Sequence, residues 1–136
     1  MQATIQHLGG VKFQAAARGH LVVCDQPAES LGGDTGMTPP ELFLSALGTC
    51  AGFYAAEYLR TRGLSAKGLE VQVTAEKATG PARLASFNVR VIVPALAPEH
   101  ETGVLRAVRA CLIHNTLTHT PAIDLTVEAG VPVEAV

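Results

Sequence analysis

The chain has 136 residues, of which 48% are hydrophobic, 16% charged and 4% aromatic, and its formal net charge is −2. This size and composition fit a single globular domain over residues 1–136 and exclude a low-complexity chain. Basic residues are scattered singly, and the uncharged run at 42–56 is shorter than a membrane span, so we expect neither a nucleic-acid partner nor a membrane.

The first quarter of the chain predicts three short antiparallel strands. Apolar and polar residues alternate over 3–7 and again over 11–17, and the glycine pair between these runs is a turn signal. A bend at Arg18-Gly19 leads into HLVVCD, which continues as the third strand. The first residues, MQATIQHLGG, lack the basic and apolar regions of a signal peptide, so we expect a cytoplasmic protein with reduced cysteines.

A glycine-containing loop over 26–38 precedes the longest predicted helix. Thr38 is a good N-cap residue, the two prolines after it fit a first helical turn, and Glu41 sits where the helix dipole favours an anion. The helix is expected to run to about Arg62 and to stop at Gly63.

The second half predicts a hairpin, a helix and a strand. Strict alternation over 69–76 and 85–93 flanks a Gly-Pro turn, which indicates a long hairpin with one apolar face. A second helix is expected to open at Pro98 and to break at Asn115, and alternation over 123–127 predicts a last strand. The order βββ-α-ββ-α-β predicts a segregated α+β fold.

Two of the three cysteines lie on apolar helical faces and invite two interpretations. Cys50 is in the middle of the first helix, and Cys111 is near the end of the second. One interpretation is a nucleophilic thiol that a peroxide oxidises to a sulfenic acid, with a second thiol that condenses with it. The other is two small apolar residues that fill a tightly packed core, where free cysteines are common.

A nucleophilic Cys50 needs a cation nearby, because apolar burial raises the pKa of a thiol while nucleophilic attack needs the thiolate. Arg18, beside a flexible glycine, is the candidate. Glu41 is the candidate to hold that arginine, but nine residues place it about 13 Å along the axis from Cys50 and on the opposite side of the helix. It would act through an intermediary or on a second subunit, or serve only as an N-terminal acid of the helix.

Metal and cofactor sites are not expected. Cys111 and His114 form one C-x-x-H pair, and His119, Cys24 and His20 are further candidate ligands, but no second pair completes a zinc pattern. The chain also contains no G-x-G-x-x-G, P-loop or G-x-S-x-G motif, so we predict no bound cofactor.

Two segments resemble the OsmC/Ohr superfamily of osmotically inducible and organic hydroperoxide resistance proteins. GGDTGMTPPELFLSALGTC is similar to the family's glycine-rich loop, P-x-E-L entry and long helix that ends on the first cysteine. ACLIHNTL is similar to its second cysteine motif, and the element order matches as well.

The resemblance implies an intertwined homodimer, with antiparallel sheets around two central helices and sites at the subunit interface. It implies that Cys50 is the peroxidatic and Cys111 the resolving cysteine of an enzyme that reduces organic hydroperoxides or hydrogen peroxide, re-reduced by a dithiol. Arg18 matches the activating arginine loosely. The Ohr-type glutamate position is occupied by Pro40 here, whereas Glu41 fits the broader OsmC-like branch. The alternative is a non-catalytic small-ligand binding or redox-sensing module on the same fold.

Overall fold

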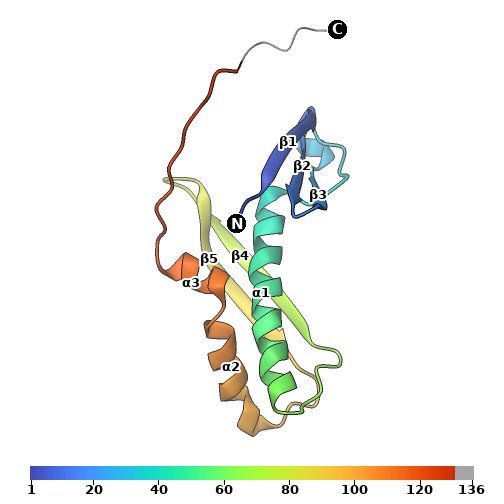
Figure 1. Cartoon of the computed structure of the whole chain (residues 1–136), viewed down its shortest axis with the longest axis vertical. Coiled ribbons are helices and arrows are strands. Elements are labelled where there is room, and N and C mark those ends of the chain that lie inside the picture. The colour runs from blue at the N-terminus through green and yellow to red at the C-terminus, as the bar shows by residue number, and fades with distance from the viewer. Residues whose placement is uncertain (131–136) are drawn as a thin grey trace.

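The computed structural model of the chain describes residues 1–130 and shows an α+β fold with two antiparallel sheets, as the sequence predicted. The three predicted N-terminal strands, the long helix and the hairpin are all confirmed (Figure 1). In chain order the elements are β1 (Thr4–Gly9), β2 (Lys12–Ala17), β3 (His20–Cys24), η1 (Ala28–Ser30), α1 (Pro39–Thr61), β4 (Glu70–Ala78), β5 (Arg83–Ile92), η2 (Pro98–His100), α2 (Glu101–Arg109) and α3 (Leu112–Thr118).

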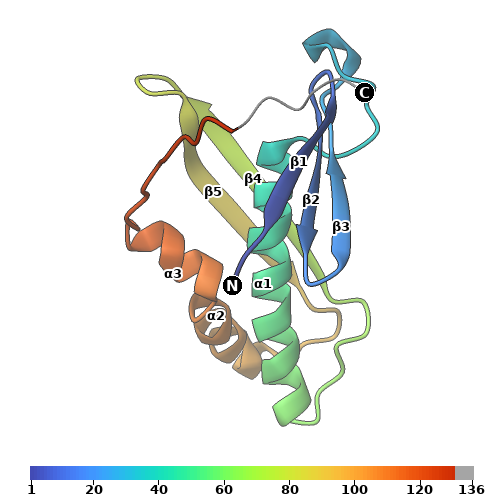
Figure 2. The ribbon, with the colours of Figure 1, turned by 45° about the horizontal axis from the view of Figure 1, so that its top comes forward.

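The first sheet, whose strands lie side by side in the order β1-β2-β3 (Figure 2), is at the N-terminal end of α1 and apart from the second sheet (Figure 1). Ala15 in the central strand pairs with Ile5 on one side and with Val22 on the other. The apolar side chains of the first sheet remain largely uncovered, since Ile5, Leu21 and Val22 are all exposed. The sheet is therefore held by its own backbone ladder, and little of its apolar surface is buried by residues 1–130.

Asp25 fixes the loop that connects this sheet to α1. Its buried carboxylate accepts hydrogen bonds from the amides of Gln26 (2.8 Å), Gly33 (3.2 Å) and Thr35 (3.0 Å), and from the Thr35 hydroxyl (2.6 Å). These bonds, with the Thr35 hydroxyl foremost, hold the pKa of Asp25 far below its usual range. A single ionised side chain thus organises the approach to the helix.

The helix α1 begins where the sequence predicted. Thr38 and Glu41 form a capping box, in which the Glu41 amide donates to the Thr38 hydroxyl (3.4 Å) and the Thr38 amide donates to the Glu41 carboxylate (2.7 Å). This reciprocal pair satisfies amides that the first helical turn would otherwise leave without partners. The helix ends at Thr61, followed by Gly63 with a φ of 66°.

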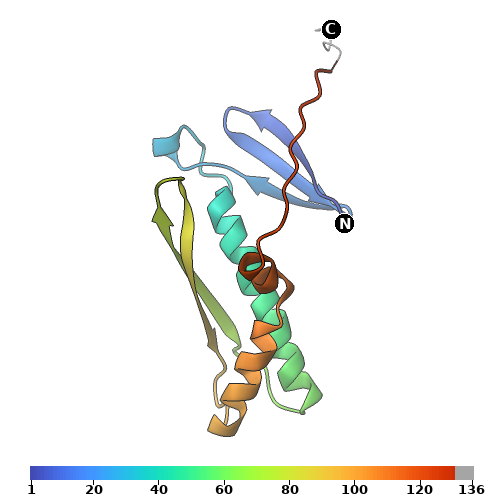
Figure 3. The ribbon, with the colours of Figure 1, turned by 90° about the vertical axis from the view of Figure 1, so that its left-hand side faces the viewer.

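The hairpin β4–β5 covers one side of α1, and α2 lies alongside the same helix (Figure 3). Close approach depends on Gly48, because a Cβ there would lie 3.0 Å from a methyl group of Val73. The core between helices and hairpin is built on Ala55, Leu59 and Val104. Around them pack the partly buried side chains of Tyr58, Leu64, Leu69, Val91, Val93, Leu96 and Val108.

By length and composition alone, α1 is long and apolar enough to cross a bilayer. Its buried residues, however, recur every four positions at Leu47, Ala51, Ala55 and Leu59, and they belong to the face covered by β4–β5 and α2. This is the packing of a core helix, and it accounts for the uncharged run at 42–56.

The predicted single second helix is wrong. After η2, α2 ends at Arg109, and the chain turns at Cys111, whose ψ of 130° is extended, before α3 begins at Leu112. Asn115 lies inside α3 and does not break a helix. Helical spacing of apolar residues continues across the turn, so the pattern did not indicate the interruption.

The predicted last strand over 123–127 is also wrong for this chain. Residues 119–130 form neither helix nor strand, and the exposed fractions of Ile123, Leu125 and Val127 are 77%, 90% and 98%. Alternation favours an extended backbone, but a strand also needs a neighbour to pair with. No backbone ladder within residues 1–130 supplies one.

We predict that Asp25→Asn lowers the melting temperature at neutral pH by about 5 °C or more, because the buried loop amides lose an ionised acceptor. The fold depresses the pKa of Asp25, so the carboxylate stabilises the folded state fully at any pH above the ordinary pKa of aspartate. This stabilisation is lost progressively as the pH falls below that ordinary value. The difference in melting temperature between the parent protein and Asp25→Asn should therefore become smaller on acidification, which thermal melts followed by circular dichroism can measure. The exposed loop residue Asp34, changed to Asn, is the matched control.

Candidate active site

Cys50 sits at the centre of α1 on the side of the helix that faces away from β4. It is half-buried, whereas its neighbour Ala51 is fully buried in the core. The position follows from helical geometry, since Gly48 and Gly52, each two residues away, are the positions that approach β4. The Cys50 thiol thus points to the side of α1 where α2 and α3 can reach it.

Cys111 lies at the junction of α2 and α3, and its side chain is completely buried. It is the N-cap residue of α3, and its sulfur accepts a hydrogen bond from the amide of His114 at 3.5 Å. The turn at this residue removes it from the regular helix and places its sulfur against α1, which packs on both α2 and α3.

The structure places these two free thiols next to each other, with the Cys50 side chain within hydrogen-bonding reach of the Cys111 thiol. Burial raises the pKa of Cys111, and the adjacent Cys50 thiol raises it further, while the amides of His114 and Ile113 offset part of the rise. Cys111 is consequently a neutral thiol at physiological pH. The half-buried Cys50 is the more accessible of the pair.

Arg18 lies in the β2–β3 turn, with an exposed side chain and a backbone φ of 52°. The turn belongs to the first sheet, and no hydrogen bond from an arginine, lysine or histidine side chain reaches either thiol within residues 1–130. One chain therefore does not bring Arg18 into contact with Cys50.

Glu41 is engaged in the cap of its own helix. Its carboxylate accepts from the amide of Thr38 and from the Thr38 hydroxyl at 3.0 Å, and these bonds, the amide foremost, lower the pKa of Glu41 below its usual value. The residue is exposed and ionised, and its sequence position places it on the helix side opposite Cys50.

The remaining candidate ligands do not converge. Across the described part of the chain, no three side chains of histidine, cysteine, aspartate or glutamate gather closely enough to hold a metal ion. Cys24 ends β3 and forms a parallel bridge with Met37, and the ring of His119 contacts the Asn115 carbonyl at 3.1 Å. His20 begins β3 and is exposed.

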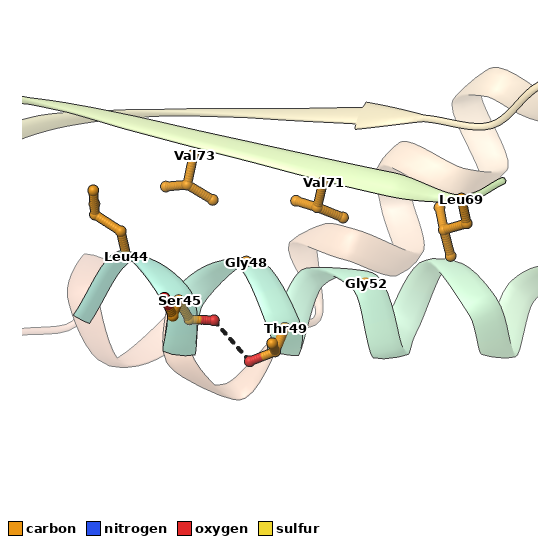
Figure 4. A pocket seen from close by; sticks show the side chains of 8 residues that line it. All are labelled: Leu44, Ser45, Gly48, Thr49, Gly52, Leu69, Val71 and Val73. Carbon is orange, nitrogen blue, oxygen red and sulfur yellow. Dashed lines mark hydrogen bonds between the residues drawn. The ribbon is translucent and has the colours of Figure 1, made fainter. Parts of the chain in front are cut away.

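An apolar cleft of about 450 Å³ follows the other side of α1, where the helix passes β4 (Figure 4). Its polar groups, the hydroxyls of Ser45 and Thr49, donate to helix carbonyls, with Thr49 bonding to Ser45 at 2.8 Å. Neither cysteine lines the cleft, which is formed by Leu44, Ser45, Gly48, Thr49, Gly52, Leu69, Val71 and Val73. The cleft is thus separate from the thiol pair.

Residues 32–126 match the model of the family described as OsmC-like protein. The chain belongs to this family. No curated protein sequence is significantly similar to it.

Solved structures share the fold of this OsmC-like chain at low sequence identity. An OsmC-like protein from Mycoplasma pneumoniae is 20% identical, with 88% of this chain and 89% of that one covered and a TM-score of 0.72. An OsmC-like protein of unknown function from Vibrio cholerae is 11% identical, with 85% and 91% covered and a TM-score of 0.70. The organic hydroperoxide resistance protein OhrB of Bacillus subtilis is 18% identical, with 88% and 93% covered and a TM-score of 0.57.

These similarities establish the fold, and family membership together with the adjacent thiols supports a redox-related role for this OsmC-like protein. The sequence identified both thiols but missed a second contact between α1 and the segment that leads into α2. Tyr58 and His100, 42 residues apart, share a hydrogen bond of 3.1 Å. The sequence contained one indication of this contact, Gly103, because glycine is uncommon inside a short helix.

We predict that iodoacetamide modifies Cys50 at least about tenfold faster than Cys111 in the native protein at neutral pH, because Cys50 is half-buried, whereas Cys111 is fully buried and burial raises the pKa of its thiol. Because burial raises the pKa of Cys111, we expect iodoacetamide to modify this thiol appreciably only at a pH above the ordinary pKa of a cysteine thiol. Peptide mass spectrometry after timed labelling measures both rates. The urea-unfolded chain is the control, in which the difference should disappear.

Proposed function

We propose that this OsmC-like protein is a cysteine-based hydroperoxide reductase that acts as a homodimer. The observation that supports this most is the pair of free thiols with unequal exposure, Cys50 half-buried on α1 and Cys111 fully buried at the α2–α3 junction. The name of the Bacillus subtilis protein of the same fold, organic hydroperoxide resistance protein, is consistent with the proposed substrate class.

The proposed reaction uses two thiols and no cofactor. The Cys50 thiolate attacks one oxygen of the hydroperoxide, the O–O bond breaks, and the alcohol leaves after taking up a proton. Cys50 is now a sulfenic acid, and the Cys111 thiol condenses with it to form a disulfide and water. A dithiol reductant returns two electrons by thiol–disulfide exchange, which restores both thiols.

Activation of Cys50 is the part of this reaction that a second subunit would supply. A neutral thiol is a poor nucleophile, and a guanidinium can stabilise the thiolate and orient a peroxide oxygen. We assign that role to Arg18 of the partner subunit, because Arg18 is exposed in its own chain and does not contact Cys50 there. Glu41, ionised and exposed in its helix cap, is assigned to holding that arginine across the interface.

Homodimer formation is supported by the amount of apolar side chain that one chain leaves uncovered. The first sheet, the Cys50 side of α1 and the segment 119–130 all expose large hydrophobic residues. Among them are Ile5, Leu21, Val22, Phe53, Ile123, Leu125 and Val127. A second copy would cover these side chains and would offer the alternating segment 123–127 a strand to pair with.

The proposed substrate is an organic hydroperoxide in preference to hydrogen peroxide. Phe53 and Tyr54 follow Cys50 on α1, and their rings meet edge to face with centroids 5.3 Å apart. An alkyl or aryl substituent gains free energy from burial beside such rings, whereas hydrogen peroxide has no apolar part to bury. Three free thiols also suit a reducing compartment, and we propose the cytoplasm.

Cys50→Ser should abolish the consumption of cumene hydroperoxide, because it removes the attacking sulfur. Cys111→Ser should still react once and stop as the Cys50 sulfenic acid. Intact mass spectrometry distinguishes the products, since the parent chain loses two hydrogens per molecule and the Cys111→Ser chain gains one oxygen. A Cys50→Ser protein that turns over at the parent rate would contradict the proposed function, and Cys24→Ser is the control that should leave the rate unchanged.

We predict that Leu125→Asp shifts the protein from dimer to monomer, because it puts a charge on the apolar side of the proposed strand. Thr126→Asp is the matched control, since it adds the same charge on the opposite side and should leave the dimer intact. Sedimentation velocity measures the outcome. A parent chain that sediments as a monomer at micromolar concentration would contradict the proposed assembly.

A further inference from the structure

The helices α1 and α2 run antiparallel and side by side, and two contacts span them in the same register (Figure 3). One is the thiol pair, and the other is Tyr58 of α1 against Gly103 of α2. Tyr58 follows Cys50 by eight residues, and Gly103 precedes Cys111 by eight. The two contacts are therefore about 12 Å apart along α1. Since Cys111 lies in the turn directly after α2, we expect a displacement of α2 at Gly103 to move Cys111 as well.

At the Tyr58–Gly103 contact the two helices meet without a side chain on α2. A Cβ added at Gly103 would overlap the hydroxyl and the ring of Tyr58. Glycine in the middle of a helix costs about 1 kcal/mol relative to alanine, and α2 has only nine residues. The contact thus uses a residue that weakens α2 locally but allows the aromatic ring to lie directly on its backbone.

The ring of Tyr58 is held on the surface of Gly103 by two further side chains. Its hydroxyl bonds to Nδ1 of His100 at 3.1 Å, and the two rings lie edge to face with centroids 6.0 Å apart. The guanidinium of Arg62 lies 3.7 Å from the ring centroid, a distance suited to a cation–π interaction. These partners oppose displacement of the half-buried ring, so we expect bulk added at Gly103 to move α2.

We infer that the Tyr58–Gly103 contact positions Cys111 for closure of the disulfide with Cys50, an inference that rests on the proposed function. Disulfide formation requires the two Cα atoms to lie within about 4.4–6.8 Å, so a small displacement of α2 is enough to hinder it. Oxidation of Cys50 by the peroxide involves no residue of α2 or α3. Condensation of the Cys50 sulfenic acid with the Cys111 thiol, which releases water, needs both helices in register.

The test is Gly103→Ala, with the two chemical steps measured separately. Cumene hydroperoxide oxidises Cys50, and dimedone traps the sulfenic acid in quenched samples, which gives the rate of the first step. Intact mass over time follows the loss of two hydrogens, which gives the rate of closure. We expect the first rate to stay within about twofold and closure to slow by about tenfold or more, as misplacement on the order of 1 Å typically does.

Two variants control for general effects of the alanine. Gly52→Ala makes the same replacement in α1, where the new Cβ would meet a Val71 methyl group at an ordinary 3.5 Å, and should close at the parent rate. Gly103→Ala combined with Tyr58→Leu removes the overlapping ring and should recover most of the lost closure rate. An effect that comes from the alanine itself, and not from its overlap with the ring, would not be rescued by this second change.

The inference is overturned if Gly103→Ala closes at the parent rate, or if both steps slow equally. If the Gly103→Ala protein does not fold, His100→Ala is the substitute test, because it frees the Tyr58 ring without adding bulk. This variant should slow disulfide closure by about threefold, as the loss of one hydrogen bond suggests, and leave the first step unchanged. Closure of that chain at the parent rate also overturns the inference. A parent chain that forms sulfenic acid but never a disulfide refutes the two-thiol reaction itself, a result distinct from any effect of Gly103.

Discussion

The burial of one side of α1 against α2 and the β4–β5 hairpin is the interaction on which the rest of the structure depends. Ala55, Leu59 and Val104 form its centre, and fully burying a leucine side chain contributes roughly 1.5–3 kcal/mol. The same packing aligns α2 along α1 and carries the start of α3 to the level of Cys50. The thiol pair is thus a product of core packing rather than of a separate loop built around it.

The structural features that the sequence predicted correctly depend on contacts between residues that are close in the sequence. The capping box at Thr38 and the alternation of the hairpin involve neighbours within a few residues or across one turn, so their patterns determine their structures. The turn at Cys111 was missed because apolar spacing does not depend on whether the helix is continuous. The strand predicted over 123–127 is absent from the described chain for another reason, since alternation describes a strand but does not create a partner for it. The contact of Tyr58 with His100 joins residues that only tertiary packing brings together.

The two thiols also differ in what the fold provides. Packing alone makes Cys111 a buried, protonated thiol, which matches a group that acts second. A nucleophilic Cys50 needs a positive charge nearby, and within residues 1–130 no arginine, lysine or histidine side chain donates a hydrogen bond to its sulfur. In the proposed reaction, the position and the activation of the nucleophile therefore have separate origins: the core of one chain determines its position, and the partner subunit supplies its activation.

The uncovered first sheet and the extended segment after α3 have a thermodynamic consequence. Where apolar surface is buried by a second copy, the free energy of that burial belongs to an association equilibrium and varies with the logarithm of protein concentration. Dilution then lowers the stability of such a chain, so a melting temperature has to be given together with the protein concentration at which it was measured. Folding acquires a second-order step, so newly made chains spend longest in the exposed state when they are scarce.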